Sequence, residues 1–370
     1  MSEPRAFVEV NLAAIAANIQ TIASETDSQI LAVVKADAYG HGLIEVARAA
    51  VESGASWLGT ALLEEALQLR AAGITAPVLA WLTPPGDDFD TALRERIDLS
   101  ISSLAILEGI LAAGERTGIT PRVHIEVDTG MTRGGFLEEW DPFLIRLREV
   151  KDSLHIVGFW THFARADEPD SDFTEQQLIL FNVLLNALQS EGIYPEIVHT
   201  ANSAGALAHK SSHKQMVRIG IAMYGLTPDI TTMGSSEKLG LIPAMSIKAK
   251  LVNVKSVPAF SRVGYGGVGV TDMDTKLGIV CMGYSDGLPR RADSTAGVSY
   301  KGELARLVGR VSMDQCVVDL GPDSQALAGE YVTVIGEDGF SADDWASAAG
   351  TINYEITTRI ASRLPRIYLR

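Results

Sequence analysis

The sequence has few cysteines, a minority of basic residues and no long apolar run. Its two cysteines, Cys281 and Cys316, form no recognisable spacing, which favours a reducing compartment. Lys and Arg number 31 against 46 Asp and Glu, and the net charge of −15 argues against broad binding to nucleic-acid phosphates. No apolar segment approaches the ~18 residues of a membrane helix. The first residues also lack the build of a signal peptide, so we expect a cytoplasmic protein that binds neither nucleic acid nor membrane.

The chain is long enough to bury a sizeable core. It has 370 residues, of which 46% are hydrophobic and 21% are charged, and this balance is typical of a globular protein. A chain of this length exceeds one ordinary core. We therefore expect one large barrel followed by a second domain.

Short apolar runs alternate with amphipathic stretches over the first 240 residues. Helical patterns follow nearly every predicted strand, for example over residues 61–72 and 173–191. Eight strand–helix units indicate a parallel sheet, and eight is the number that closes a (β/α)8 TIM barrel. An open doubly wound sheet is the alternative. The eight predicted strands are 30–34, 56–59, 78–82, 98–102, 122–127, 155–160, 196–199 and 215–218.

The pattern changes near residue 241 to a mostly-β domain. Turn-forming residues separate the predicted strands, and a single clear helix is predicted over 341–349. The domains are therefore expected at 1–240 and 241–370, joined by a linker at 227–243, with an N-terminal strand that could join the β domain. The predicted strands of this domain are 246–257, 277–282, 305–311, 315–320 and 331–335.

Lys35 ends an apolar strand and is followed by a glycine-rich turn. The segment 35–42 has the sequence Lys-Ala-Asp-Ala-Tyr-Gly-His-Gly. A lysine at a strand end is most often a surface residue with its amine in water. The carboxyl ends of barrel strands, however, are where active sites assemble, and a desolvated lysine there can form a Schiff base.

This octet resembles the pyridoxal-phosphate motif of the alanine racemase family, in which the lysine carries the cofactor. Matching segments recur from position 35 to position 356. The resemblance implies a barrel that binds pyridoxal 5'-phosphate and a C-terminal β domain. It also implies an isomerase that interconverts L- and D-alanine and so supplies D-alanine for peptidoglycan.

Further barrel segments carry the resemblance. It implies that Arg133 binds the substrate carboxylate, that His162 lies against the pyridine ring and that Asp167 lines the substrate access corridor. On residue type alone, Arg133 would more often be a surface arginine and His162 a structural histidine. A glycine-flanked arginine nonetheless offers a fixed fork of donors to a carboxylate.

The segments after the last two barrel strands form the usual phosphate corner of this fold. The resemblance implies that the phosphate is bound by the Ser203 hydroxyl and the backbone N–H groups of Gly220 and Ile221, and that Asn202 also binds the cofactor. Asn202 and Ser203 could instead cap a helix, or do both. The family usually has proline where this chain has Ile219.

The resemblance also implies that Arg218 donates to the pyridine nitrogen. A permanently charged donor keeps that nitrogen from taking a proton, because two adjacent cations are unfavourable. The ring is then a weaker electron sink, which disfavours side reactions such as transamination.

The β domain contributes a glycine-rich segment, 264–269, around Tyr265. The segment matches a dinucleotide fingerprint, but no βαβ unit frames it and we reject that interpretation. The resemblance makes Tyr265 the second catalytic base, which reaches into the partner subunit's site. The resemblance also places Tyr39 and Tyr354 near the cofactor and the backbone of Met313 at the substrate carboxylate. The residues that it places along the access corridor are Tyr284, Arg290, Arg310 and Ile352.

Racemisation needs a base on each face of a planar carbanion, and the resemblance assigns Lys35 to D-alanine and Tyr265 to L-alanine. A homodimer with shared sites is implied. Two alternatives remain: a racemase for serine, lysine or a broader range of amino acids, and a non-catalytic pyridoxal-phosphate-binding protein. The second domain argues against the latter.

Glu126 departs from the family pattern. Many relatives have a lysine here that becomes carbamylated, and the resulting anion holds the substrate-binding arginine. Strand alternation puts Glu126 on the face opposite to residues 123, 125 and 127. It either faces solvent or a structural partner, or it supplies a built-in negative charge for Arg133. The second hypothesis needs a bridging water or an inward shift of Arg133, because a glutamate is shorter than a carbamylated lysine.

Two patterns resemble metal sites. His209 and His213 are spaced i, i+4, but neighbouring lysines favour an exposed polar face. The acidic cluster at 167–172 lacks the spacing of a calcium loop. We expect no metal.

Overall fold

The computed structural model describes residues 3–370; Met1 and Ser2, part of the segment judged not to be a signal peptide, lie outside the described residues. The chain forms two compact units. The barrel unit comprises Ile15–Ala38 and Leu43–Ile242. The β unit comprises the residues up to Ala14, Tyr39–Gly42 and Pro243–Arg370.

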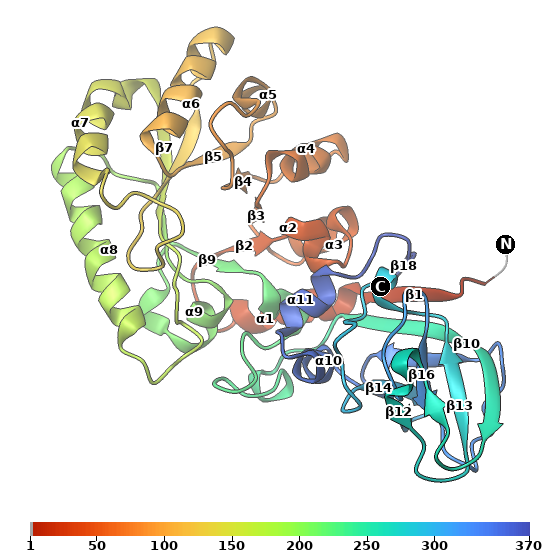
Figure 1. Cartoon of the computed structure of the whole chain (residues 1–370). Coiled ribbons are helices and arrows are strands. Elements are labelled where there is room, and N and C mark those ends of the chain that lie inside the picture. Colours follow the sequence, from red (N-terminus) through yellow and green to blue (C-terminus); the bar gives the residue numbers. More distant parts are fainter. Residues whose placement is uncertain (1–2) are drawn as a thin grey trace. The chain divides into compact units, whose positions relative to one another are not determined.

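The barrel unit contains eight parallel strands in the order β8-β7-β6-β5-β4-β3-β2-β9 (Figure 1). The Gln215 N–H donates to the Val198 carbonyl at 3.1 Å and the Arg218 N–H to the Ala201 carbonyl at 3.0 Å, which joins β9 to β8. The sheet therefore closes, and the predicted (β/α)8 barrel is confirmed against the open sheet. The strands are β2 (Gln29–Val33), β3 (Trp57–Thr60), β4 (Val78–Ala80), β5 (Asp98–Ile101), β6 (Arg122–Glu126), β7 (His155–Trp160), β8 (Ile197–His199) and β9 (Met216–Ile219).

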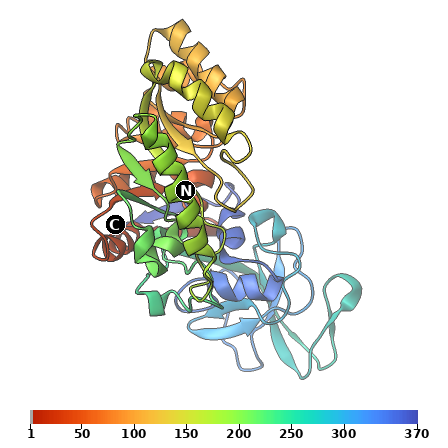
Figure 2. The same ribbon diagram turned by 90° about the vertical axis from the view of Figure 1, so that its left-hand side faces the viewer.

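The helices of this unit bury one face each on the barrel strands. In α6 (Leu104–Thr117), Ile106, Ile110 and Ala113 are buried at helical spacing, Ser103 caps the first turn and Gly118 ends the helix in a left-handed conformation. Figure 2 shows the long helix α8 along the outside of the barrel. The other helices are α1 (Leu12–Ala23), which crosses from the β unit, α3 (Leu43–Glu52), α4 (Leu63–Ala71), α5 (Phe89–Arg94), α7 (Trp140–Val150), α8 (Phe173–Ser190) and α9 (Ser203–Ala208).

The segment predicted as a linker packs on the barrel unit instead. Met233 is buried in a cluster with Phe163 and Leu178, and the backbone of Ile242 is held by the side chain of Asn18. A glycine- and serine-rich composition predicted a linker here, but a few apolar side chains suffice to bury part of the segment.

The β unit is built on one large sheet. β10 (Met245–Val257) lies at its centre and pairs antiparallel with β1 (Ala6–Asn11), β13 and β17. β1 also pairs in parallel with β18 (Arg366–Leu369), so the N-terminal strand lies in this sheet. The remaining elements are β11 (Arg262–Val263), β12 (Gly269–Val270), β13 (Thr275–Val280), β14 (Gly297–Tyr300), β15 (Glu303–Arg306), β16 (Cys316–Asp319), β17 (Tyr331–Ile335), α10 (Ala342–Ala349) and α11 (Asn353–Thr358).

The β unit departs from the sequence prediction in several elements. Strands β14 and β18 and the short helix α11 were not predicted. The strand predicted at 305–311 is wrong beyond Arg306, because only an isolated bridge from Leu307 to Val318 follows. Gly309 has a φ of 77°, which ends the extended conformation there.

Candidate active site

Four of the predicted site residues gather at the carboxyl ends of the barrel strands. Lys35, His162 and Arg218 lie at or just beyond the ends of β2, β7 and β9, and Arg133 lies in the loop after β6. Burial lowers the pKa of His162 well below its ordinary value, and the positive charges of Arg218, Arg133 and Lys35 act in the same direction. The structure thus brings three cations and a neutral histidine into one place.

Lys35 has its amine in partly desolvated surroundings. The side chain is half-buried, and Nζ lies 5.8 Å from the centre of the Trp81 ring. Burial lowers the pKa of Lys35, the charge of Arg133 lowers it further, and Glu65 acts in the opposite direction. A lowered pKa raises the fraction of neutral amine, which is the nucleophilic form. The side chain of Lys35 is therefore less accessible to water than that of an ordinary surface lysine.

The turn after Lys35, labelled α2 (Lys35–Tyr39) in Figure 1, is left-handed. Ala36, Asp37 and Ala38 have φ values of 52°, 54° and 53°, and Tyr39 has 54°. Each such residue costs about 1–2 kcal/mol relative to the right-handed conformation. Gly40 follows with a φ of 81°. A turn of this kind persists only where its surroundings hold it, and such strain is concentrated at functional sites.

Arg218 is the most enclosed charge of the site. It is 4% exposed, and its two terminal nitrogens donate to the carbonyls of His199, Thr161 and Thr200 at 3.0, 2.8 and 3.2 Å. Its guanidinium also lies 4.8 Å from the centre of the Trp160 ring. Burial lowers the pKa of Arg218 to about 9, which leaves it charged at neutral pH. Among the described residues, its Nε–H finds no acceptor, so one donor of this residue remains for a ligand.

A chain of buried polar side chains continues from Arg218 into the barrel. Arg218 lies 3.3 Å from His199 Nδ1, His199 Nε2 lies 2.9 Å from His124 Nδ1, and His124 Nε2 lies 3.5 Å from Asp98 Oδ2. Arginine has no acceptor, so His199 must accept at Nδ1 and carry its proton on Nε2. That proton points at His124 Nδ1, which places the proton of His124 on Nε2, facing the Asp98 carboxylate. Burial lowers the pKa of His199 well below its ordinary value, consistent with a neutral ring.

The roles of His124, His199 and Asp98 were not predicted from the sequence. The signal that could have found them is chemical: a histidine or an aspartate inside a strand that is buried on both faces must have a polar partner. The three side chains are 0%, 0% and 2% exposed.

Glu126 is buried rather than facing solvent. It is 7% exposed, and burial raises its pKa to about 7, against the effect of Arg218 and, less strongly, Arg133. Its carboxylate makes no hydrogen bond or ion pair with any described residue, and Arg133 itself is exposed. The surface alternative is therefore wrong, while a direct Glu126–Arg133 ion pair is not formed.

The phosphate corner brings together Ser203 and Gly220. The Gly220 N–H donates to Ser203 Oγ at 2.9 Å, and Ile221 begins the following short turn. Asn202 caps α9, since its Oδ1 accepts the Gly205 N–H at 2.9 Å, as the capping alternative predicted. Backbone N–H groups and a hydroxyl in one corner suit a phosphate.

Asp167 lies in the loop between β7 and α8. Its carbonyl accepts a hydrogen bond from the Thr232 hydroxyl at 2.5 Å, and burial raises the pKa of its carboxyl group. The loop is thereby tied to the segment that precedes Ile242.

In the β unit, Tyr265 stands at the tip of a hairpin. It follows β11, β12 pairs with β11 beyond it, and Gly264 and Gly266 have φ values of 73° and 76°. The tyrosine is 70% exposed. A short glycine hairpin offers no βαβ unit, so the dinucleotide interpretation remains rejected.

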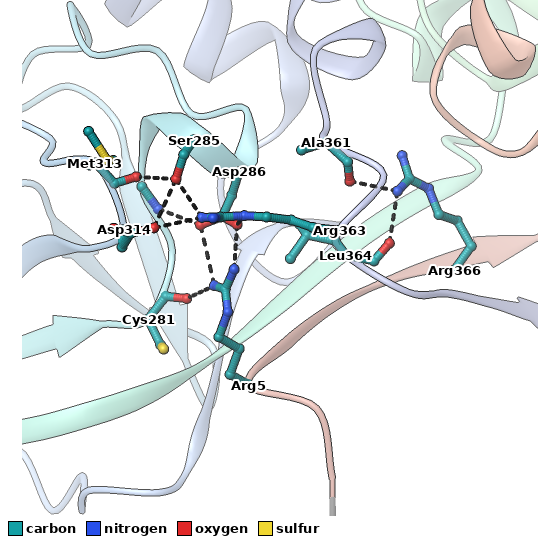
Figure 3. A network of polar contacts seen from close by, with 11 residues as sticks. Arg5, Cys281, Ser285, Asp286, Met313, Asp314, Ala361, Arg363, Leu364 and Arg366 are labelled. Atoms are coloured by element: carbon teal, nitrogen blue, oxygen red, sulfur yellow. Dashed lines mark hydrogen bonds and ion pairs between the residues drawn. The ribbon is translucent and has the colours of Figure 1, made fainter.

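A buried carboxylate organises the loop that carries Tyr284 (Figure 3). Asp286 accepts hydrogen bonds at 2.6 Å from both Arg5 and Arg363. Burial alone would raise the pKa of Asp286, but the two arginines outweigh it and the pKa is lowered. Ser285, next to Asp286, donates from its N–H and its hydroxyl to the Met313 carbonyl at 2.9 and 2.7 Å. The network thus fixes the backbone at Met313.

The other predicted residues of the β unit fall in two places. The rings of Tyr39 and Tyr354 lie 6.1 Å apart, and burial raises the pKa of Tyr39. Arg290 and Arg310 line a surface hollow of about 930 Å³. Ile352, just before α11, is 57% exposed.

The residues fit pyridoxal phosphate by their chemistry. A half-buried amine, a buried guanidinium N–H without an acceptor and a corner of N–H groups match its aldehyde, ring nitrogen and phosphate. Within residues 3–370, no group of three or more His, Cys, Asp or Glu side chains is placed to hold a metal ion. No helix in the same range is both long and apolar enough to cross a membrane.

Both units of the chain match known protein families. Residues 10–228 match the family described as "Alanine racemase, N-terminal domain", and residues 244–368 match "Alanine racemase, C-terminal domain". The alanine racemase of Frankia casuarinae is 42% identical over 372 residues, covering 99% of this chain and 96% of the relative. That of Beutenbergia cavernae is 44% identical over 370 residues, covering 97% of each.

Solved structures agree with these matches. Alanine racemase from a D-cycloserine-producing Streptomyces lavendulae superposes with a TM-score of 0.97 at 41% identity, covering 100% of this chain and 98% of the other. Alanine racemase from Bacillus anthracis, solved with bound L-Ala-P, gives 0.91 at 37% identity, covering 100% and 96%.

Proposed function

Because this chain belongs to the alanine racemase family of pyridoxal-phosphate-dependent isomerases, we propose that Lys35 and Tyr265 are the two bases with which it interconverts L- and D-alanine. The observation that carries the proposal is that one barrel contains both a partly desolvated Lys35 amine and an Arg218 N–H that lacks an acceptor. Either feature alone would suit a structural role, but together they match two ends of one cofactor.

Pyridoxal phosphate, when bound, supplies a conjugated ring that delocalises the negative charge left on the substrate Cα. Lys35 would hold the cofactor through its amine and would move the α-proton on the face of D-alanine. Tyr265 moves the α-proton on the opposite face, that of L-alanine. An amine is charged and a phenol is neutral when it carries the proton, so the two directions are chemically distinct.

The remaining barrel residues bind and orient. Arg218 would donate its free N–H to the ring nitrogen and, being charged, would keep that nitrogen unprotonated. His162 lies against the ring, and Arg133 binds the substrate carboxylate. The phosphate is held by Asn202, Ser203, Gly220 and Ile221, with Tyr39 and Tyr354 beside the cofactor.

A homodimer with shared sites is part of the proposal. The exposure of Tyr265 supports it, because a catalytic base surrounded by water on its own chain needs a second surface to desolvate it. Met313 would then bind the carboxylate through its backbone, and the corridor would be lined by Asp167, Tyr284, Arg290, Arg310 and Ile352. A cytoplasmic location, consistent with two free cysteines, completes the proposal.

The deciding experiment is chiral chromatography of the purified protein after incubation with L-alanine, L-serine or L-lysine. We expect D-alanine to form much faster than D-serine or D-lysine. Comparable rates with serine or lysine would replace the proposal by a broader racemase. No D-amino acid from any of the three would defeat it.

A further inference from the structure

Glu65 connects the turn that follows Lys35 to the next strand–helix loop. It lies in the first turn of α4, and its Oε1 accepts the Ala36 N–H at 2.6 Å. Its Oε2 accepts the N–H groups of Ala61 and Leu62 at 3.0 and 3.1 Å. One carboxylate therefore satisfies three backbone donors, and it does so one residue beyond Lys35. Nothing in the proposed function uses this side chain.

The turn that Glu65 holds is the strained left-handed segment. Its four non-glycine residues with φ between 52° and 54° would relax to ordinary conformations without outside support. The second support is Asp37, whose Oδ1 accepts the Leu43 N–H at 2.8 Å at the far end of the turn. A carboxylate thus holds each end, and the one nearer to Lys35 comes from another element of the barrel.

Only a carboxylate of this length can make the three contacts. A glutamine has one carbonyl oxygen, so its NH₂ group would face either Ala36 or the Ala61 and Leu62 donors. An aspartate keeps the charge but is shorter by one bond of about 1.5 Å, too short to reach across. The charge of Glu65 also acts on Lys35, where it opposes the lowering of the pKa by burial.

We propose that Glu65 is a positioning residue for Lys35: its carboxylate fixes the left-handed turn and so holds the amine in the orientation needed to carry the cofactor and move the α-proton. The inference rests on the proposed function of Lys35. It adds a residue that contacts neither cofactor nor substrate and acts only through the backbone of the turn.

The test compares Glu65→Gln and Glu65→Asp with Glu64→Gln in the holoenzyme. Glu64 is the matched control, since it is exposed, lies in the same helical turn and makes no side-chain hydrogen bond to a described residue. Hydrogen exchange at the Ala36 amide, resolved by mass spectrometry of overlapping peptides that begin several residues before Lys35, reports the tether directly. The kcat and KM for L-alanine report its consequence.

We expect both Glu65 variants to speed exchange at Ala36 at least about tenfold and to lower kcat about 10- to 100-fold, since small misplacements of a reacting group have effects of this order. The KM should change less than about threefold, because carboxylate binding is untouched. Glu64→Gln should match the wild type in all three measurements.

Equal exchange and equal kcat in the Glu65 and Glu64 variants would overturn the inference. If the Glu65 variants do not fold, the wild type still decides it, because an unprotected Ala36 amide there excludes the tether. Borohydride labelling separates the two proposals: label on a lysine other than Lys35 defeats the proposed function, while the exchange contrast at Ala36 is measured independently of it.

Discussion

The two proposed bases stand in opposite surroundings. Lys35 is half-buried and follows β2, the strand that pairs with the strand of Arg218. Arg218 is 4% exposed, and its terminal nitrogens already donate to backbone carbonyls of the barrel. Tyr265 is 70% exposed at the tip of a glycine hairpin, and its hydroxyl makes no hydrogen bond with any described residue. The surroundings of Lys35 come from its own unit, whereas Tyr265 is exposed to solvent.

This difference shows which part of the proposed active site is organised within one chain and which part is left exposed to solvent. The fold of the barrel unit already orients its charged side chains, so these side chains need little rearrangement during the reaction. The hairpin carries a reactive group without a dry environment, which a second subunit would supply. Changes in the barrel should therefore act within one chain, whereas changes in the hairpin should act between chains.

The largest effect is expected from Lys35→Ala. It removes both the attachment point of the cofactor and one base, and loss of a base alone costs about 10²–10⁴-fold in rate. Borohydride reduction and peptide mapping of the wild type should label Lys35 and no other lysine. Lys238→Ala, at an exposed position, is the control and should keep full activity. Label elsewhere would contradict the assignment.

Mixing Lys35→Ala with Tyr265→Ala protein tests whether the two bases come from different chains. Each variant alone should be nearly inactive. Random exchange makes about half of the dimers mixed, each with one intact site, so about a quarter of wild-type activity should return. Exchange is checked by co-purification of differently tagged subunits. Exchange without recovery would place both bases in one chain.

His199→Leu and His199→Asn examine how the barrel unit orients Arg218. Leucine removes the acceptor facing the guanidinium, and a buried donor left unpaired costs about 1–3 kcal/mol. We expect kcat to fall about tenfold and the absorption maximum of the bound cofactor to shift. Asparagine can keep an acceptor near the Nδ1 position and should stay within about threefold of wild type. Equal loss in both variants would show that Arg218 does not depend on this acceptor.

Glu126→Gln should have the smallest kinetic effect. Since Glu126 makes no ion pair with the exposed Arg133, we expect the KM for alanine to rise, or kcat to fall, about two- to fivefold. Wild-type activity should not respond to bicarbonate. Unchanged kinetics would show that the charge plays no part in holding Arg133.

The same variant has a pH signature in stability. The pKa of Glu126 is about 7 when folded and near 4.5 when unfolded, so between these values the folded state binds more protons. The free energy of unfolding of the wild type should therefore fall by about 3 kcal/mol between pH 4.5 and pH 7 from this group alone. Glu126→Gln should lack that fall, which thermal unfolding at several pH values can measure.

The barrel was predictable from the sequence because its strands are near-continuous apolar runs of even spacing, such as Gln29–Val33. Strand β18 was missed, since it is short and gains its partner β1 only from distant sequence. The N-terminal strand β1 was expected to join the β domain, and it pairs there with β10 and β18. The motif residues were predictable by resemblance. Glu65 was not, because a glutamate in the first turn of a helix is common and only the fold shows that it reaches Ala36.

The strand order of the β unit has a consequence for how the chain is made. β1, at residues 6–11, pairs with β10 and β18, which are synthesised more than 230 residues later. The barrel strands follow one another and can close while synthesis continues, whereas one edge of β1 stays unpaired until β10 emerges and the other edge until β18 emerges near the end of the chain. Pairing this distant in sequence is slow to form. Assembly of the β sheet, rather than closure of the barrel, should therefore set the time at which a nascent chain becomes active. Until then, the unpaired edge of β1 is the segment that a chaperone would need to cover.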